Sequence, residues 1–361
     1  NNGVSVMTGD GEVLAVEGSS GNGERTIQVD GAGFIVGETI TKAAGGYVVS
    51  RAGAPKDRVA LTFDDGPDPE FTAQILDTLK SRGAVASFFV LGRQVQRFPE
   101  LTRRIAAEGH EIGNHSWSHA DLAHMSESAI RVELAATGHV IEAVTGQHPL
   151  LFRPPYIGDA RPSTEERLRP MAVANTLGYR VAGLEIDPKD WFETNPDVIV
   201  ANAMRAIERD VGRIVLLHDA GGDRSSTLAA LGPLIDSLRA HGYRLTTVAG
   251  LLNGTANAGM SRAPKGEAPQ RALNVAAMYA ANTAESLLVG AFLVALLLGI
   301  LRLVLIVGLA SMQRLWPRYA RRADDGRFVP KVSVLVPAYI EARVIQRTIQ
   351  SLLDQAYDHL E

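Results

Sequence analysis

Two adjacent acids, Asp64 and Asp65, follow a run of apolar residues and precede a Gly-Pro pair in the segment Thr-Phe-Asp-Asp-Gly-Pro. Neighbouring residues of a strand point to opposite faces. At a strand end, one of these acids could therefore bind a metal ion while the other accepts a proton. Aspartate is also common in solvated turns, so the segment taken alone leaves both interpretations open.

Two histidines, His115 and His119, lie four residues apart in the segment His-Ser-Trp-Ser-His. At this spacing two imidazoles can share one helical face and bind one ion through ring nitrogens. Exposed or packed histidines are the more common explanation of the spacing by itself. Together with an aspartate from another strand end, the pair would form a site with metal positions left open, which is typical of catalytic sites.

Three more segments place polar or aromatic residues after expected strands. Arg-Pro-Pro-Tyr at 153–156 offers an arginine that could pair with a carboxylate, in a loop stiffened by proline. Asp-Pro-Lys-Asp-Trp at 187–191 offers an indole that could wall a sugar site or pack in the core. Leu-Leu-His-Asp at 216–219 offers a histidine suited to general acid catalysis, or a structural one.

Metal ligands in this chain must be histidine, aspartate or glutamate, because there is no cysteine. Other histidines match none of the segments above, and we interpret five of them as surface or packing residues: His110, His124, His139, His148 and His241. The formal net charge of -4 gives no general basic surface, so nucleic acid is not a favoured partner.

The elements that must position these segments alternate between strand and helix. Strand-like runs are expected at Val59–Phe63, Val85–Val90, Glu111–Gly113, Leu150–Arg153, Tyr179–Leu184, Ile214–Leu217 and Arg244–Val248, with helices near 70–82, 97–108, 126–144, 164–177, 196–209 and 226–241. Such alternation indicates an α/β fold of parallel strands with helices packed outside. About seven strands fit a distorted or incomplete (β/α) barrel, in which loops after the strands build the active site.

Composition predicts the domain boundaries around this region, 55–253. Residues 1–54 are glycine-rich and are expected to be a linker, or the tail of an upstream domain, with a few short strands. Residues 254–285 are rich in Ala, Gly, Pro and Asn and are also expected to be a linker. Residues 286–312 are predicted to form a transmembrane helix, since about 20 apolar residues span a bilayer. Residues 313–361 are a basic segment followed by a strand and a helix.

The basic residues after the predicted membrane helix favour one orientation. They are Arg314, Arg318, Arg321, Arg322, Arg327 and Lys331. Such a cluster is expected to stay on the cytoplasmic side. The protein is therefore predicted to sit in a membrane, in contact with lipid through 286–312, with 55–253 outside and the C-terminal segment inside.

Taken in order, the five segments resemble the NodB-homology polysaccharide deacetylases, carbohydrate esterase family 4. They are TFDDGP at 62–67, HSWSH at 115–119, RPPY at 153–156, DPKDW at 187–191 and LLHD at 216–219. The resemblance implies an enzyme that uses a metal ion to remove N-acetyl groups from an N-acetylglucosamine polymer or oligomer. The ion would be Zn²⁺, with another divalent ion such as Co²⁺ as an alternative.

The resemblance also implies a role for each matching residue. Asp64 would be the general base, and His218 the general acid that protonates the leaving amine. Asp65, His115 and His119 would bind the metal.

The remaining matches would shape and support the site. Arg153 would pair with the general base, and Asp190 would tune the general acid. The backbone amide of Tyr156 would hold the oxyanion. Trp191 would wall the groove, and Leu216 would line the acetyl pocket.

The C-terminal residues carry a second resemblance. Val334–Tyr339 with Glu341 resembles the first strand and turn of family 2 glycosyltransferases, but Ile340 stands where that family usually has asparagine. The order of deacetylase, membrane helix and partial α/β glycosyltransferase domain resembles bifunctional membrane proteins that make and modify an exported polysaccharide.

Two other functions remain open from the sequence. The same centre could cleave O-acetyl esters of another polysaccharide such as xylan. The chain could also be a glycan-binding pseudoenzyme, although its acid, base and ligand residues are all present.

Overall fold

The computed structural model describes residues 4–19, 24–42, 46–53, 55–157, 160–253, 259–263, 268–315, 333 and 345–354. The chain divides into two compact units, Asn1–Ser286 and Leu287–Glu361.

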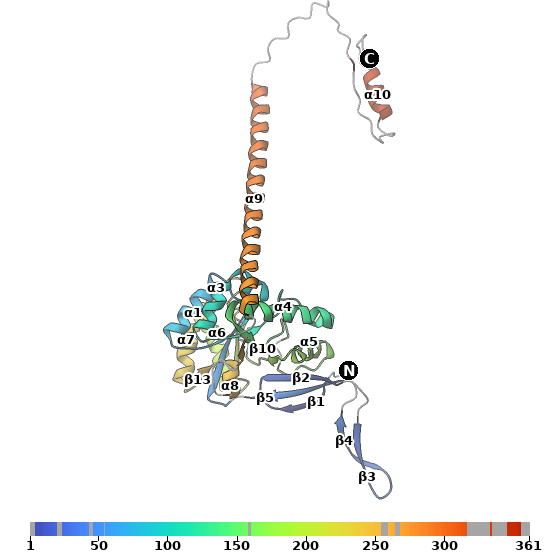
Figure 1. Cartoon of the computed structure of the whole chain (residues 1–361), viewed down its shortest axis with the longest axis vertical. Helices are drawn as coiled ribbons and strands as arrows, with labels where there is room; N and C mark the ends of the chain where they lie inside the picture. Colours follow the sequence, from blue (N-terminus) through green and yellow to red (C-terminus); the bar gives the residue numbers. More distant parts are fainter. Residues whose placement is uncertain are drawn as a thin grey trace, which may run out of the picture. The chain divides into compact units, whose positions relative to one another are not determined.

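The first unit is built on one large sheet (Figure 1). Among the described residues it has ten strands, in the order β1-β5-β2-β11-β10-β8-β7-β6-β12, with β13 also paired to β6. Seven of its strands form a series that pairs in parallel: β6 (Arg58–Asp64), β7 (Ser87–Val90), β8 (Glu111–Asn114), β10 (Leu151–Phe152), β11 (Arg180–Ala182), β12 (Ile214–His218) and β13 (Arg244–Thr246). Each of them overlaps a predicted run, so the α/β prediction is confirmed.

Helices connect the parallel strands. They are α1 (Phe71–Ser81), α2 (Gly92–Arg97), α3 (Pro99–Ala107), α4 (Glu127–Thr145), α5 (Glu165–Thr176), α6 (Pro196–Glu208), α7 (Ser225–Ala240) and α8 (Val248–Asn253), with a short 3₁₀ turn at Leu122–His124. The apolar side of α1, with Ile75, Leu76 and Leu79, is buried in the same core as Leu61 and Phe63 of β6. Strand β6 is buried on both faces, which explains its nearly continuous apolar sequence.

The helix predicted near 97–108 is α3, and a second helix that was not predicted, α2, directly precedes it. α2 ends at Arg97, and α3 begins at Pro99. Proline disfavours the helical conformation in the residue before it, and Phe98 accordingly has φ -128° and ψ 58°. Pro99 is suited to the first position of the second helix, where its missing N–H is not needed.

The two ends of the parallel series approach each other. Ile186, beyond β11, forms an isolated parallel bridge with Val215 of β12. The Leu216 N–H donates to the Ile186 carbonyl over 3.0 Å. This contact is what the prediction of a distorted or incomplete barrel requires.

Three N-terminal strands belong to the same sheet: β1 (Val4–Gly9), β2 (Val13–Ser19) and β5 (Gly46–Ala52). Leu14 of β2 pairs antiparallel with Val181 of β11, and Leu14, Val16 and Val49 are fully buried. The linker prediction for 1–54 therefore does not hold for these strands. They are too short to form a core alone, but they contribute to one built with α5 and β11.

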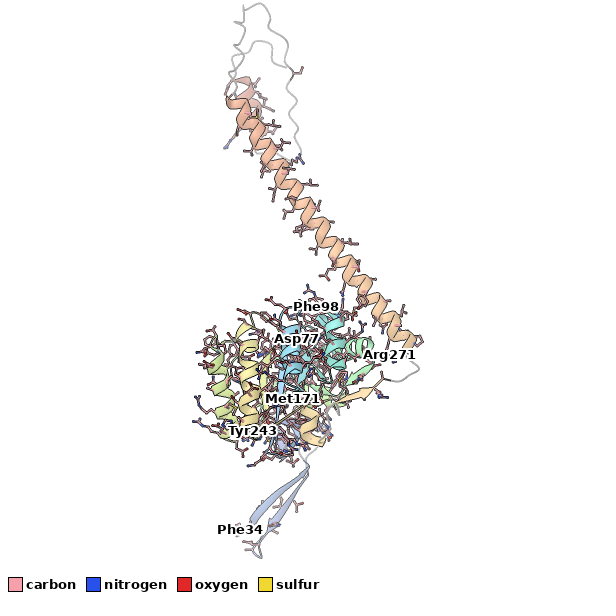
Figure 2. All side chains as sticks on the ribbon, turned by 90° about the vertical axis from the view of Figure 1, so that its left-hand side faces the viewer. Phe34, Asp77, Phe98, Met171, Tyr243 and Arg271 are labelled. Carbon is pink, nitrogen blue, oxygen red and sulfur yellow. The ribbon has the colours of Figure 1, made fainter. Side chains whose placement is uncertain are left out.

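A separate hairpin lies between β2 and β5 along the chain. Its strands are β3 (Glu24–Val29) and β4 (Ile35–Lys42). Phe34 stands at its tip (Figure 2) with 71% of its surface exposed. A second small pairing joins β9 (Gln147–Pro149) to β14 (Met260–Arg262).

Helix α9 (Ala268–Leu315) begins well before the predicted membrane segment. The linker prediction for 254–285 is therefore wrong from Ala268 onward. Alanine is frequent here and is the strongest helix former. This part of the helix belongs to the first unit and packs within it: Met278 is buried in the main core, and Asn282 donates to the Gln96 carbonyl over 2.7 Å.

The second unit contains the apolar continuation of α9. Its side chains from Leu287 to Met312 are exposed. By length and composition, one helix within Ala268–Met312 could cross a membrane. α10 (Ile345–Leu353) lies in the region where a C-terminal helix is expected. The predicted strand at 332–339 lies outside the described residues, apart from Ser333.

Candidate active site

One cavity of about 840 Å³ collects residues from all five predicted segments. They are Asp64, Asp65, His115, His119, Arg153, Tyr156, Asp187, Trp191, Leu216 and His218. They come from the C-terminal ends of β6, β8, β10, β11 and β12 or from the loops that follow. The cavity is therefore where a strand–helix barrel places its active site.

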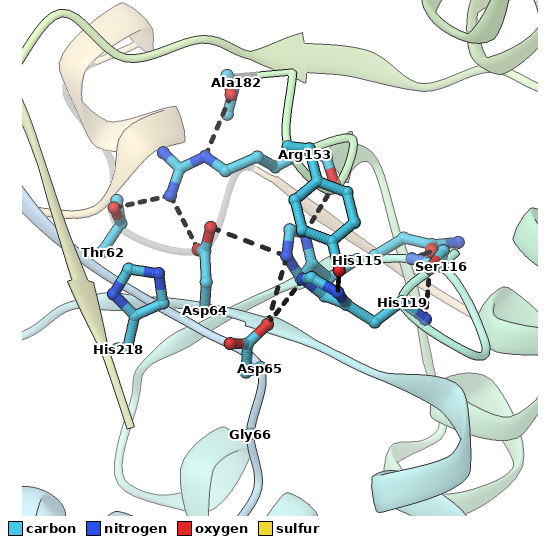
Figure 3. A network of polar contacts seen from close by, with 12 residues as sticks. Thr62, Asp64, Asp65, Gly66, His115, Ser116, His119, Arg153, Ala182 and His218 are labelled. Carbon is cyan, nitrogen blue, oxygen red and sulfur yellow. Dashed lines mark hydrogen bonds and ion pairs between the residues drawn. The ribbon is translucent and has the colours of Figure 1, made fainter. Parts of the chain in front are cut away.

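Three of these residues form a cluster that could hold a metal ion. The ligand atoms of Asp65, His115 and His119 all lie within 4.8 Å of one another. Asp65 Oδ1 is 3.1 Å from His119 Nε2 and 3.5 Å from His115 Nε2 (Figure 3). Among the described residues this buried oxygen has no regular hydrogen-bond partner, as expected of an atom that faces a cation.

The other nitrogen of each imidazole is already engaged. His115 Nδ1 lies 2.7 Å from the Arg153 carbonyl, and His119 Nδ1 lies 3.0 Å from the Tyr156 hydroxyl. A carbonyl oxygen can only accept, so His115 Nδ1 carries a proton, and in the neutral ring Nε2 keeps its lone pair. Outer contacts of this kind orient the histidine ligands of metal sites.

The two histidines do not share a helical face, contrary to the geometry expected from their spacing. They lie in a loop after β8, in which Ser116 and His119 have φ of 71° and 61°. The carboxylate of Glu133 on α4 accepts from the Trp117 and Ser118 N–H groups at 2.8 and 2.9 Å. Ser118 Oγ donates to the same carboxylate at 2.9 Å. The turn, rather than helical periodicity, brings the imidazoles together.

The side chains of the two adjacent acids face different partners because the backbone turns at Asp65, whose φ is 80°. This conformation is uncommon for a residue other than glycine. Asp65 turns toward the histidines, while Asp64 Oδ1 accepts from Arg153 Nη1 at 2.8 Å. Burial alone would raise the pKa of Asp65, but the adjacent imidazoles of His115 and His119 hold that pKa well below its usual range.

Arg153 is buried and lies beside Asp64, Thr62 and Ala182 (Figure 3). Its Nη1 donates to Asp64 and to Thr62 Oγ1, each at 2.8 Å, and its Nε donates to the Ala182 carbonyl at 3.1 Å. The guanidinium also lies 4.2 Å from the centroid of the Phe89 ring. These contacts fix the arginine, and with it the Asp64 carboxylate.

His218 is held by Asp190. Asp190 Oδ1 is 2.8 Å from His218 Nδ1, and Oδ2 accepts from the His218 N–H and from Thr227 Oγ1, also at 2.8 Å. Burial would lower the pKa of His218, but the hydrogen bond to Asp190 raises that pKa above its usual value. The imidazole can therefore carry a proton and donate it.

Three more of the predicted residues line the cavity. Tyr156 has φ of 62° and a largely exposed ring. Trp191 is half exposed, and its Nε1 donates to Asp187 Oδ2 at 3.3 Å. Leu216 is nearly buried in the cavity wall. The structure thus brings all ten predicted site residues to one place.

Two acids near the site were not singled out from the sequence. Glu133 resembles any charged residue of a helix, and nothing in its spacing distinguishes it. Asp219 directly follows His218, and its position at the end of β12 was a usable signal. Asp219 accepts from the Gly66 N–H at 3.1 Å and from Thr72 Oγ1 at 2.5 Å, and burial raises its pKa to about 7.

Two of the histidines outside the segments, His110 and His124, are a packing residue and a surface residue, as predicted. His110 is buried, its Nδ1 accepts from the Ala86 N–H at 3.2 Å, and burial lowers its pKa to about 4. His124 is exposed and lies beside Asp121. Neither belongs to the three-residue metal cluster.

Comparison with known proteins agrees with this site. The sequence profile of the polysaccharide deacetylases matches residues 51–182. A peptidoglycan-N-acetylglucosamine deacetylase of Bacillus cereus is 39% identical over 211 residues, covering 57% of this chain and 93% of that protein. A chitooligosaccharide deacetylase of Rhizobium leguminosarum bv. trifolii is 36% identical over 208 residues, covering 55% of this chain and 93% of that protein.

A solved structure is also similar. It is a peptidoglycan N-acetylglucosamine deacetylase in complex with 4-naphthalen-1-yl-N-oxidanyl-benzamide, with a TM-score of 0.51 and 33% identity. The match covers 56% of this chain and 92% of that one. Fold and site thus define a hydrolase of carbohydrate amides. The chain belongs to the polysaccharide deacetylase family, which confirms the resemblance to the NodB-homology enzymes.

Proposed function

We propose that this protein removes N-acetyl groups from an N-acetylglucosamine-containing polysaccharide with the help of a bound divalent metal ion, and releases acetate. The observation that carries the proposal is the Asp65–His115–His119 cluster, which lines the same cavity as the carboxylate of Asp64 and the imidazole of His218. Similarity to deacetylases of peptidoglycan and of chitooligosaccharides supports the substrate class.

The three clustered residues fit a metal ion. Two imidazole nitrogens and one carboxylate oxygen are a common ligand set of catalytic zinc, and Co²⁺ would accept the same ligands. When bound, the ion would polarise the amide carbonyl and lower the pKa of water. His115 presents Nε2 as its free nitrogen because Nδ1 is bound to the Arg153 carbonyl.

Asp64 and His218 would move the protons of the reaction. Asp64 would accept a proton from the attacking water, while Arg153 keeps its carboxylate in place. His218 would then protonate the leaving nitrogen, with its Nδ1 held by Asp190. Positioned proton transfer of this kind contributes about 10²- to 10⁴-fold to a rate.

Three residues would bind the substrate around the reacting amide. The backbone N–H of Tyr156 would donate to the oxyanion. Leu216 would contact the acetyl methyl, and Trp191 would lie against the sugar.

Acetate release over a panel of chitin oligomers, peptidoglycan and acetylated xylan tests the proposal. We expect acetate and an equal amount of free amine from the first two, lost with a chelator and restored by zinc. Acetate from xylan without free amine from the other substrates would favour the O-acetyl esterase instead. No acetate from any substrate, with the glycan still bound, would indicate a pseudoenzyme.

We also propose how the chain is organised. The catalytic domain would extend beyond 55–253 to include β2 and β5, which pair with its sheet. The segment 286–312 would span a membrane in contact with lipid, with the catalytic domain outside and 313–361 inside. The resemblance of 313–361 to a glycosyltransferase fragment stays a prediction.

A further inference from the structure

Phe192 is an exposed aromatic residue next to the cavity wall. We propose that Phe192 and Trp191 together form a two-ring platform, and that Phe192 binds the sugar next to the one being deacetylated. This inference rests on the proposed function, because it assigns the platform to the same polysaccharide. It predicts that the protein prefers polymeric substrates over small acetylated compounds that have no neighbouring sugar.

The exposure of the two rings is the first observation. Phe192 is 75% exposed and Trp191 is 52% exposed. The ring centroids are 5.9 Å apart, with 56° between the planes. Exposing apolar surface to water costs about 25 cal/mol per Å². Adjacent exposed rings at the edge of a cavity therefore indicate a surface that a ligand covers.

The backbone that carries the platform is fixed to the catalytic centre. Lys189 has φ of 64°, which turns the chain so that Asp190 points inward. Asp190 is buried and binds both the backbone and the imidazole of His218. The Phe192 N–H closes this turn by donating to the Lys189 carbonyl at 3.0 Å. The backbone that carries the rings therefore has a set position relative to His218, and little backbone ordering is needed on binding.

The chemistry of the rings matches a β-linked aminosugar. Such a pyranose presents C–H groups on its faces and hydroxyl and amide groups around its edge, so a flat aromatic surface can cover one face and leave the polar edge in water. Trp191 lines the cavity and would cover the reacting sugar. Phe192 is outside the described lining of that cavity, so it would cover the neighbouring unit along the chain.

The test compares a polymeric substrate with a small one. In Phe192→Ala, we expect kcat/KM for the chitin hexamer to fall about three- to tenfold, mainly through KM. p-Nitrophenyl acetate has no neighbouring sugar. The fold decrease in kcat/KM for this substrate should be at least threefold smaller than that for the hexamer. Phe192→Tyr keeps a ring and should restore the hexamer rate.

Phe34→Ala provides the matched control. Phe34 is as exposed as Phe192 but lies at the tip of the β3–β4 hairpin. Its removal should leave both substrates unaffected. A loss in Phe192→Ala that is equal for both substrates would mean that the ring only supports Trp191, and would overturn the inference.

Binding separates this inference from the proposed function. Calorimetric titration of the chitin hexamer into the protein should show about three- to tenfold weaker affinity for Phe192→Ala than for the unaltered chain. Equal affinity of Phe192→Ala and the unaltered chain for the hexamer would overturn the inference, whether or not acetate is released. If the hexamer binds through Phe192 but no substrate loses acetate, only the proposed hydrolysis fails.

Discussion

At the scale of single residues, Arg153 links the two halves of the site. Its main-chain carbonyl accepts from His115 Nδ1, and its side chain donates to Asp64. The predicted metal ligand and the predicted base are therefore positioned by one residue. Asp64 and Asp65 are neighbours in sequence, but they face different partners because of the positive φ at Asp65.

The base assignment can be tested by Asp64→Asn. The amide keeps the shape of the side chain but cannot accept a proton from water. We expect kcat to fall by about 10²- to 10⁴-fold, with metal content unchanged, as measured by acetate release and elemental analysis. Turnover close to that of the unaltered chain would remove Asp64 from the proposed role.

Glu133 offers a second test at this scale. Its carboxylate accepts from the Trp117 and Ser118 N–H groups and so holds the loop that carries both histidines. Groups that position metal ligands typically contribute about 10- to 100-fold in metal affinity or activity. Glu133→Gln should therefore weaken zinc binding by about tenfold or more, measured by competition with a chromogenic chelator.

Glu127→Gln is the control for this change, because Glu127 is an exposed acid in the first turn of the same helix. If Glu133→Gln bound zinc as tightly as Glu127→Gln, the loop would not depend on this carboxylate.

At the scale of elements, local sequence predicts what local interactions decide. The seven strands of the parallel series and most of the helices around them are found within a few residues of their predicted ranges, because each carries its own apolar pattern; the short helices α2 and α8 were not predicted. The sequence predicts a linker, or the tail of an upstream domain, where β2 and β5 lie, because their burial depends on β11, which is far along the chain. The prediction that His115 and His119 share a helical face is wrong because Glu133 and a left-handed turn set the conformation of their loop.

Glu12 is the element-scale contact that can be tested by pH. Its carboxylate joins the start of β2 to β12, accepting from the Arg213 N–H at 2.5 Å and from the Ile214 N–H at 3.1 Å. Burial raises the pKa of Glu12 from its ordinary value of 4.5 to about 7. Between these values the folded chain holds a proton that the unfolded chain has lost. Stability should therefore fall as pH rises from about 5 to 7, by up to about 3 kcal/mol.

The measurement is urea unfolding of Glu12→Gln against pH. The amide of this variant does not titrate, so the decline of its free energy of unfolding between about pH 5 and 8 should be shallower. Asp219 also has a raised pKa and would leave part of the slope. Glu17→Gln, an exposed change on the same strand, should keep the full slope. Identical slopes in all three proteins would contradict the role of Glu12.

At the scale of the whole molecule, the proposal places catalysis outside the membrane. The apolar part of α9 is exposed along its length and could cross a bilayer. Full-length protein expressed in bacterial cells should therefore sediment with membranes and require detergent for release. Protease added to intact spheroplasts should cleave the catalytic domain. Complete protection there, with cleavage after lysis, would reverse the proposed orientation.

The central claim is that Asp65, His115 and His119 bind one catalytic ion. Zinc content and acetate release of His119→Ala, measured on the same folded samples, test it most directly. We expect about one zinc per chain in the unaltered protein, and loss of both zinc and acetate release in the variant with its circular dichroism preserved. A variant that kept one zinc per chain and its activity would contradict this account.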